Sequence, residues 1–270
     1  MRVRFTVAYL GTPFSGWQSQ RDGNAVQDHI ERALLGIVGE RVRIAGAGRT
    51  DAGVHALGQV FHADVERPCL VPEAWVRALN ARLPPEIRIL HARRVRPDFH
   101  ARFSAMGKVY RYQIETGPVL GPMEHGRAWH VVPAPSVEQM RQAARLFVGR
   151  HDFSAFSGAS PGASRDPVRE LRRVDVLARG SRVTVVLEGE GFLYKMARML
   201  VAALVRVGQA KATLEELAAA LKQGGPRQNH VAPACGLTLV RVIYAAGSSS
   251  QRVEGVRSAR FSRAAFLGEC

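Results

Sequence analysis

Cysteine is scarce in this sequence. The three cysteines among 270 residues, Cys69, Cys235 and Cys270, lie far apart along the chain. An odd number without C-x-x-C spacing argues against a disulfide framework and against a cysteine-based metal site. We therefore expect a protein of a reducing compartment, the cytoplasm.

Long hydrophobic runs are missing as well. The longest, Met199 to Val205, is bounded by Arg198 and Arg206. It is far shorter than the roughly 20 apolar residues that a membrane-spanning helix needs. The first residues alternate apolar and polar side chains like a strand and lack the apolar core of a signal peptide. The sequence thus predicts a soluble protein.

Acidic residues are few relative to basic ones. Lys plus Arg number 38 against 23 for Asp plus Glu, which gives a formal net charge of +15, and nearly all of the excess is arginine. With 46% hydrophobic residues the chain has the composition of a folded globular protein. So large a surplus favours a polyanionic partner, nucleic acid first, because neutralised phosphates release counterions. An arginine-rich solvated surface is the alternative, and charge does not separate DNA from RNA.

Apolar periodicity predicts an α+β chain without regular strand–helix alternation. Helices are expected after Asn24, Pro72, Ser136, Gly191 and Thr213, with capping boxes formed by Asn24 and Gln27 and by Thr213 and Glu216. Residues 149–152 are expected to close the third helix, and 154–166 to form a loop. The expected strands are residues 3–10, 42–45, 59–65, 87–92, 108–114, 171–177, 183–187 and 237–244, and those at 171–177 and 183–187 are expected to form a hairpin around residues 179–181.

The second half of the chain echoes the first. Residues 149–152 repeat the Gly-Arg-x-Asp pattern of residues 48–51. We therefore predict two related lobes with antiparallel sheets, residues 1–104 and 105–245. A polar, basic tail, residues 246–270, follows, and no structure is assigned to it.

The residues around Asp51 combine types that a purely structural loop has little reason to combine. Glycines surround Asp51 between two expected strands, so the backbone can turn tightly and let a ligand approach. Arg49 supplies a permanent cation suited to phosphate, and His55 can donate, accept or carry a proton. The pattern predicts a functional loop held by a rigid scaffold. An ordinary surface turn that contains Asp and Arg is the alternative.

The chemistry available to Asp51 is limited by what is missing around it. No P-loop, dinucleotide fingerprint or second convincing acid accompanies it, and glycoside hydrolysis normally needs two carboxylates. A metal site from Asp51, His55 and His62 is conceivable, but the sequence sets no geometry for it. A single aspartate can be a covalent nucleophile on an anomeric carbon or an activated ring. It must then stay ionised, which a half-buried arginine secures by lowering its pKa.

Two further features suit that chemistry. Arg198 lies in an otherwise apolar helical run, where an arginine usually has a partner, either Asp51 or any nearby carboxylate or carbonyl. Tyr110 and Tyr112 share one face of an expected strand with Lys108, which suits base stacking and phosphate contact. Two ordinary sheet tyrosines are the alternative.

The segment Gly48–Ala56 resembles the signature of the tRNA pseudouridine synthase A family. The resemblance covers nearly the whole chain up to about Tyr244. After Tyr194 it departs at Lys195, Ala197 and Met199 but keeps Arg198. Further matching segments are residues 9–12, 16–18, 99–104, 110–112, 151–153, 191–194 and 233–237.

The resemblance implies a cofactor-free isomerase that converts uridine to pseudouridine in the anticodon stem-loop of tRNA, at positions 38, 39 and 40. It implies a homodimer in which one tRNA contacts both subunits, with a basic cleft between two ferredoxin-like lobes. By the same resemblance Asp51 is the nucleophile, Arg198 pairs with it, Tyr110 stacks on the flipped uracil, and Arg49 holds the RNA backbone or the loop.

Three points stay open. Asp51 either forms an ester at C1′ or attacks the ring. Tyr110 is a candidate base at C2′, although a phenol with an ordinary pKa of about 10 needs help in that role. A non-catalytic RNA-binding module and a metal-dependent nuclease are the alternative functions.

Overall fold

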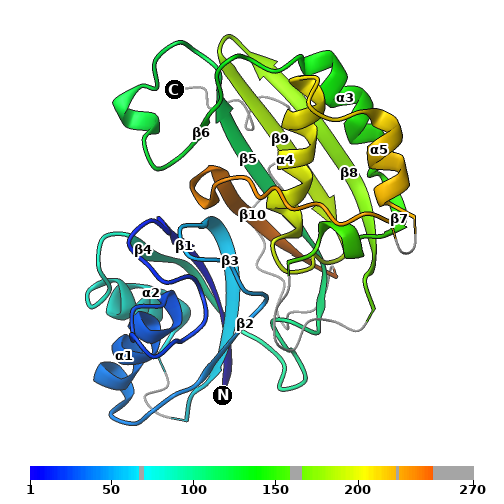
Figure 1. The fold of residues 1–270 in the computed structure, drawn as a ribbon. Coiled ribbons are helices and arrows are strands. Elements are labelled where there is room, and N and C mark those ends of the chain that lie inside the picture. The colour runs from blue at the N-terminus through cyan, green and yellow to red at the C-terminus, as the bar shows by residue number, and fades with distance from the viewer. Residues whose placement is uncertain (67–69, 159–165, 223–224, 246–270) are drawn as a thin grey trace.

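The computed structural model describes residues 1–66, 70–158, 166–222 and 225–245 (Figure 1). The predicted tail and Cys69 and Cys270 lie outside these residues, as does most of the loop expected at 154–166. None of the helices in the described part is long and apolar enough to span a membrane.

The strands of both halves form one ten-stranded sheet in the order β4-β1-β3-β10-β5-β9-β8-β7, with β2 beside β3 and β6 beside β5. The strands are β1 (Arg2–Tyr9), β2 (Ile44–Gly46), β3 (His55–Asp64), β4 (Ile87–Arg94), β5 (Ala105–Glu115), β6 (Trp129–His130), β7 (Gly149–Asp152), β8 (Val168–Arg179), β9 (Arg182–Gly189) and β10 (Leu237–Tyr244).

Helices cover the sheet in two groups (Figure 1). One group packs near β4 and the other near β8. The helices are α1 (Val26–Val38), α2 (Pro72–Asn80), α3 (Val137–Leu146), α4 (Met196–Gly208) and α5 (Leu214–Ala220). Of these, α4 is buried along nearly its whole length, because apolar side chains cover almost every side of it. Arg198 is therefore a cation at the start of a core helix.

The two halves of the chain share one apolar core. A single cluster of buried side chains runs from Phe5 and Phe61 near β1 and β3 to Leu200 in α4. A smaller cluster, which includes Val60 and Phe99, lies on the other face of the sheet, since Val60 and Phe61 are neighbours on one strand.

Strand β10 joins the halves, although it is the last element in the described chain. It pairs parallel to β3, with Thr238 opposite His55, and antiparallel to β5, with Leu239 opposite Tyr110. The expected α+β class is confirmed, but the sheet is continuous and contains this parallel pair. The strands that border the glycine-rich loop and carry Tyr110 are thereby fixed relative to each other.

Two local predictions are wrong. Residues 149–152 do not close α3; they form β7, an edge strand paired with β8. The capping box at Asn24 and Gln27 is absent, because Ala25 is the N-cap of α1 and its N–H donates to Asp28 Oδ2 at 3.0 Å. The box predicted at Thr213 and Glu216 is confirmed, with both reciprocal hydrogen bonds present.

Candidate active site

The segment from Ala47 to Val54 connects β2 to β3, as the sequence predicts, and neighbouring strands hold it at several points. Gln59 Nε2 donates to the carbonyl of Gly48 at 2.8 Å, and the Ala47 N–H donates to the carbonyl of Val60 at 2.7 Å. The hydroxyls of Tyr9 and Thr50 lie 2.8 Å apart and are hydrogen-bonded. We call residues 47–54 the Asp51 loop. These contacts hold the first half of the loop against buried strands.

Two glycines give the Asp51 loop its shape. The Val54 N–H donates to the carbonyl of Asp51 at 3.1 Å, which closes a turn in which Gly53 has a φ of 79°. That left-handed backbone favours glycine. Gly16, with a φ of 93°, packs against the loop so closely that an added Cβ would lie 2.7 Å from the Thr50 carbonyl oxygen.

Asp51 and Arg198 meet across the molecule. Arg198 Nη1 donates to Asp51 Oδ2 at 2.7 Å, although the residues are 147 positions apart. The side chains are 21% and 15% exposed, respectively. This charge-assisted hydrogen bond is short, and one carboxylate oxygen is left without an ion-pair partner among the described residues. The predicted pairing of Asp51 with Arg198 is thus present.

A second contact fixes the direction of the Arg198 side chain. Its Nε donates to the carbonyl of Ala232 at 2.8 Å, and the Ala232 N–H donates back to the Arg198 carbonyl at 3.3 Å. Arg198 is the third residue of α4, and the side chains of a helix point toward its N-terminus. The guanidinium therefore reaches Asp51 from the first turn of a buried helix.

Tyr110 lies in the same region on β5. Its ring meets Phe192 edge-on, with centroids 4.9 Å apart, and only 7% of the residue is exposed. Burial raises the pKa of the Tyr110 phenol above its ordinary value, and the nearby Tyr9 and Asp51 raise it further. The phenol is therefore neutral at neutral pH. Such a group suits stacking and hydrogen bonding better than the role of a general base.

Tyr112 is placed differently. It is fully buried, and its hydroxyl donates to the carbonyl of Pro233 at 2.8 Å. Gly236 lies directly against its ring, since an added Cβ there would be 2.5 Å from two ring atoms. Tyr112 is a core residue, so only Tyr110 of the two is a candidate for substrate contact.

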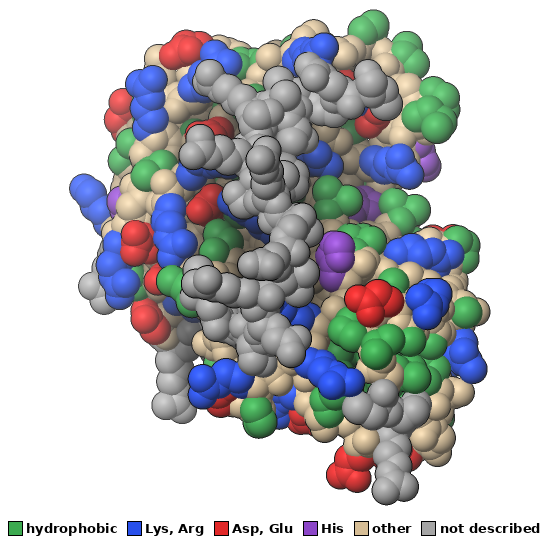
Figure 2. Space-filling model, turned by 180° about the vertical axis from the view of Figure 1, so that it is seen from behind, with side chains coloured by type: hydrophobic (Ala, Val, Ile, Leu, Met, Phe, Trp, Pro, Cys, Tyr) green, Lys and Arg blue, Asp and Glu red, His purple; other side chains and the backbone are tan. Residues whose placement is uncertain are grey.

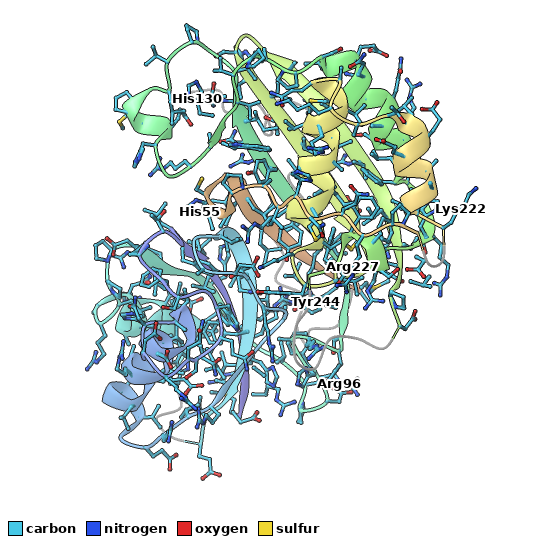
Figure 3. All side chains as sticks on the ribbon, in the orientation of Figure 1. His55, Arg96, His130, Lys222, Arg227 and Tyr244 are labelled. Atoms are coloured by element: carbon cyan, nitrogen blue, oxygen red, sulfur yellow. The ribbon has the colours of Figure 1, made fainter. Side chains whose placement is uncertain are left out.

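His55, which is labelled in Figure 3, is hydrogen-bonded to three separate parts of the backbone. The Gly11 N–H donates to Nδ1 at 2.9 Å, while Nε2 faces the carbonyls of Gly126 and Cys235 at 3.0 and 2.9 Å. Nε2 therefore carries the proton. Burial lowers the pKa of His55, so the ring is neutral. Both ring nitrogens are hydrogen-bonded to backbone groups.

The structure does not gather the conceivable metal ligands. Nδ1 of His62 accepts from the Ala101 N–H at 3.2 Å, away from the contacts of His55. In the part of the chain that the structure describes, no three His, Cys, Asp or Glu side chains are placed to hold a metal ion.

Arg49 belongs to the Asp51 loop and is exposed, whereas its neighbour Thr50 is buried. Among the described residues its guanidinium has neither a hydrogen bond nor an ion pair, so it is available to an anion. Sequence reasoning noted Lys108 only as a neighbour of Tyr110, but the structure places its ammonium beside Gly48 of the Asp51 loop. It also missed the anchoring role of His55, for which the sequence holds no signal.

Comparison with known proteins gives a consistent result. A family described as tRNA pseudouridine synthase matches residues 6–104 and 143–245. These two segments contain Asp51, Tyr110's partner Phe192 and Arg198.

Curated relatives match nearly the full length. A protein named tRNA pseudouridine synthase A from Akkermansia muciniphila is 49% identical over 252 residues, which cover 90% of this chain and 95% of the relative. Proteins of the same name from Syntrophotalea carbinolica and Solidesulfovibrio magneticus are 44% and 47% identical. Their alignments cover 90% and 91% of this chain and 96% and 92% of the relatives.

Proposed function

Because the chain belongs to the tRNA pseudouridine synthase family, we propose that the Asp51–Arg198 pair is the centre at which it isomerises uridine in tRNA. The single observation that carries this proposal is the 2.7 Å contact between Arg198 Nη1 and Asp51 Oδ2, close to Tyr110. The chain is thus an enzyme, an isomerase that forms pseudouridine.

In the proposed mechanism Asp51 is the nucleophile. The bond between N1 of the base and C1′ of the ribose breaks, and a bond between C5 and C1′ forms. The proton on C5 is lost and N1 gains one, so substrate and product have the same atoms and no cofactor is required. Both attack at C1′ and attack on the ring use the carboxylate oxygen that Arg198 leaves unpaired.

Arg198 positions that carboxylate in the proposal. Its second hydrogen bond, to the carbonyl of Ala232, restricts the guanidinium to one orientation. The reacting oxygen is then held in place before the substrate arrives, which is the source of the large rate gains from orientation.

Tyr110 is the proposed platform for the extruded uracil, and Arg49 the proposed contact to the RNA backbone or the loop. A base must leave its stack to reach a carboxylate in a half-buried site. The neutral Tyr110 ring, supported edge-on by Phe192, offers an aromatic surface next to Asp51. Arg49 is free to bind a phosphate on the exposed side of the loop.

The larger assembly is also a proposal. We infer two ferredoxin-like lobes, residues 1–104 and 105–245, around a cleft that takes the anticodon stem-loop, in a cytoplasmic homodimer. Basic side chains spread over the face in Figure 2 support an RNA partner. Exposed apolar side chains at Val119, Met123 and Val132 support a contact between subunits. Light scattering of the purified protein would determine the mass of the assembly.

Nucleoside analysis of treated tRNA tests the proposed function. Unmodified tRNA transcript is incubated with the protein, digested and examined for pseudouridine by liquid chromatography and mass spectrometry. Isomerase activity predicts a gain of pseudouridine equal to the loss of uridine, unaffected by a chelator. Salt-sensitive binding without a change in nucleosides indicates the runner-up, an RNA-binding module, and cleaved RNA indicates a nuclease.

A further inference from the structure

A group of cations, Lys108, Arg102, Arg169 and Arg172, has no acidic ion-pair partner among the described residues and no role in the chemistry described above. Its centre is Lys108, two residues before Tyr110 on β5. A Cβ built on Gly48 would lie 2.6 Å from Lys108 Nζ, so the ammonium rests against the backbone of the Asp51 loop. Among the described residues, Nζ has neither a hydrogen bond nor an ion pair.

The surroundings of Lys108 are basic. Burial, together with the nearby positive charges of Arg102 and Arg169, lowers the pKa of Lys108 to about 8. Like charges held together near a partly buried ammonium are unfavourable unless an anion joins them. An anion bound among these cations, beside the Asp51 loop, would relieve their repulsion.

One of these side chains, Arg169, lines an open hollow. It has a volume of about 480 Å³ and is lined by Ala105, Met106, Arg169, Arg172, Glu190 and Gly191. Arg172 donates to the Met106 carbonyl at 2.9 Å, and Arg169 donates to the carbonyls of Asp166 and Val168, so both guanidinium groups are anchored by backbone rather than by carboxylates. Glu190 is the acid of the lining, and one of its oxygens accepts from the Glu170 N–H at 3.2 Å.

The hollow borders the proposed uracil platform. Gly191 in its lining is followed by Phe192, whose ring packs on Tyr110 at 4.9 Å. Lys108 thus rests against the Asp51 loop, and Arg169 of the hollow's lining is near enough to lower its pKa. A nucleotide with its base on Tyr110 would have its own sugar–phosphate chain in this vicinity.

We propose that Lys108, with Arg169 and Arg172, binds a backbone phosphodiester flanking the extruded uridine, and so positions that nucleotide over Asp51. The ligand is the phosphate of an RNA strand, and the inference rests on the proposed function. Lys108 is a binding and positioning residue in this account, because no reacting atom needs to touch it.

The test combines a charge removal in the protein with one in the RNA. Wild type, Lys108→Met, Lys108→Arg and the control Lys222→Met are assayed for kcat/KM of pseudouridine formation between 50 and 300 mM salt, a range chosen around physiological ionic strength. Lys222 is exposed at the far edge of the molecule, near α5 (Figure 3). The RNA is a synthetic tRNA stem-loop, with either normal phosphates or one uncharged methylphosphonate flanking the target uridine on its 5′ or 3′ side.

We expect Lys108→Met to lower kcat/KM by about tenfold, the loss of one charge-assisted hydrogen bond. The plot of log kcat/KM against log salt concentration should become shallower, with a slope smaller in magnitude by about 0.7 to 0.9, the value for one phosphate contact. Lys108→Arg and Lys222→Met should keep slopes near wild type. One methylphosphonate should weaken the wild type but cost Lys108→Met little more, because both changes remove the same contact.

An unchanged salt slope in Lys108→Met, or equal losses for both proteins with each methylphosphonate, overturns the inference. Should Lys108→Met fail to fold, the methylphosphonates are compared on wild type and Arg169→Gln, where additive losses again overturn it. A wild type that forms no pseudouridine contradicts the proposed function itself, so the two failures are distinguishable.

Discussion

Tyr110 and Tyr112 show how far a side chain's position decides its use. They lie on the same face of one strand, and the sequence pattern does not distinguish their roles. Tyr112 packs against Gly236 and its hydroxyl donates to the Pro233 carbonyl, whereas the Tyr110 hydroxyl has no hydrogen-bond partner among the described residues and the side chain lies near Asp51. Only the surrounding loops distinguish the two.

These positions predict different losses on substitution. Tyr112→Phe should lower the free energy of unfolding by about 1 kcal/mol, since the Pro233 carbonyl loses its donor, and leave kcat within about twofold. Tyr110→Ala should lower kcat/KM by about 100-fold, because stacking on the uracil is worth ~1–3 kcal/mol and the ring also holds Phe192. Urea unfolding and pseudouridine assays separate these effects. Equal catalytic losses would show that the wrong tyrosine was chosen.

Arg198 makes two hydrogen bonds that lysine cannot reproduce together. Arg198→Lys keeps the charge but cannot span Asp51 and the Ala232 carbonyl with one planar fork. We expect kcat to fall by roughly 10- to 100-fold in Arg198→Lys and by more in Arg198→Met, because the Asp51 carboxylate is then no longer held in its reacting orientation. Steady-state kinetics of the pair decide this, and a fully active Arg198→Met would remove Arg198 from the account.

The Asp51 loop depends on an element that the sequence places far from it. Gly16 belongs to the segment after β1, yet it packs on the Thr50 carbonyl, and the Trp17 N–H donates to that same oxygen at 3.1 Å. The residues that follow β1 therefore help to fix the position of the Asp51 loop.

Gly16→Ala should displace the Asp51 loop. The new Cβ would lie 2.7 Å from the Thr50 oxygen, and a φ of 93° strains any L side chain. A shift of about 1 Å at a reacting group can cost 10²-fold in rate, so we expect a loss of that order in kcat with tRNA binding retained. Gly180→Ala, also at positive φ but in the β8–β9 turn with open space around it, is the matched control. Equal kcat in the two variants would contradict the coupling.

Sequence patterns predicted the elements better than their connections. The α+β class, the helix at Thr213 and the β8–β9 hairpin follow from local periodicity and turn residues. Strand β10 was also predicted, but its place between β3 and β5 was not, because strand order depends on contacts between residues more than about 120 positions apart. Residues 149–152 were misread as a helix end, because a four-residue edge strand carries too short a pattern.

Some roles of the candidate site residues could be predicted from the sequence and others could not. Asp51 and Arg198 could be matched from their types, a carboxylate on a glycine loop and a cation in an apolar run. The bridging of His55 to Gly11, Gly126 and Cys235 could not, since its partners are backbone groups that any residue supplies.

Stability of the whole molecule should depend on pH through its buried histidines. His62 is 6% exposed, and burial, with help from Arg2 and His100, lowers its pKa to about 4. The unfolded value is about 6.5, so the unfolded chain binds more protons and stability falls as the pH drops from 6.5 toward 4.

Between pH 7 and pH 5 this single group predicts a loss of about 2 kcal/mol in the free energy of unfolding. Urea unfolding of wild type and His62→Gln at both pH values measures it. The wild type should lose more stability than the variant by roughly that amount. The same loss in both proteins would assign the effect to other groups.

The joined sheet brings together a loop from the first half and a helix from the second, and the proposed chemistry requires both. The most direct test is pseudouridine formation by Asp51→Asn under single-turnover conditions, with tRNA binding measured in parallel. We expect a rate lower by about 10⁴-fold or more, as for loss of a nucleophile or its direct partner, and binding within a few-fold of wild type. Turnover near the wild-type rate in Asp51→Asn would contradict it.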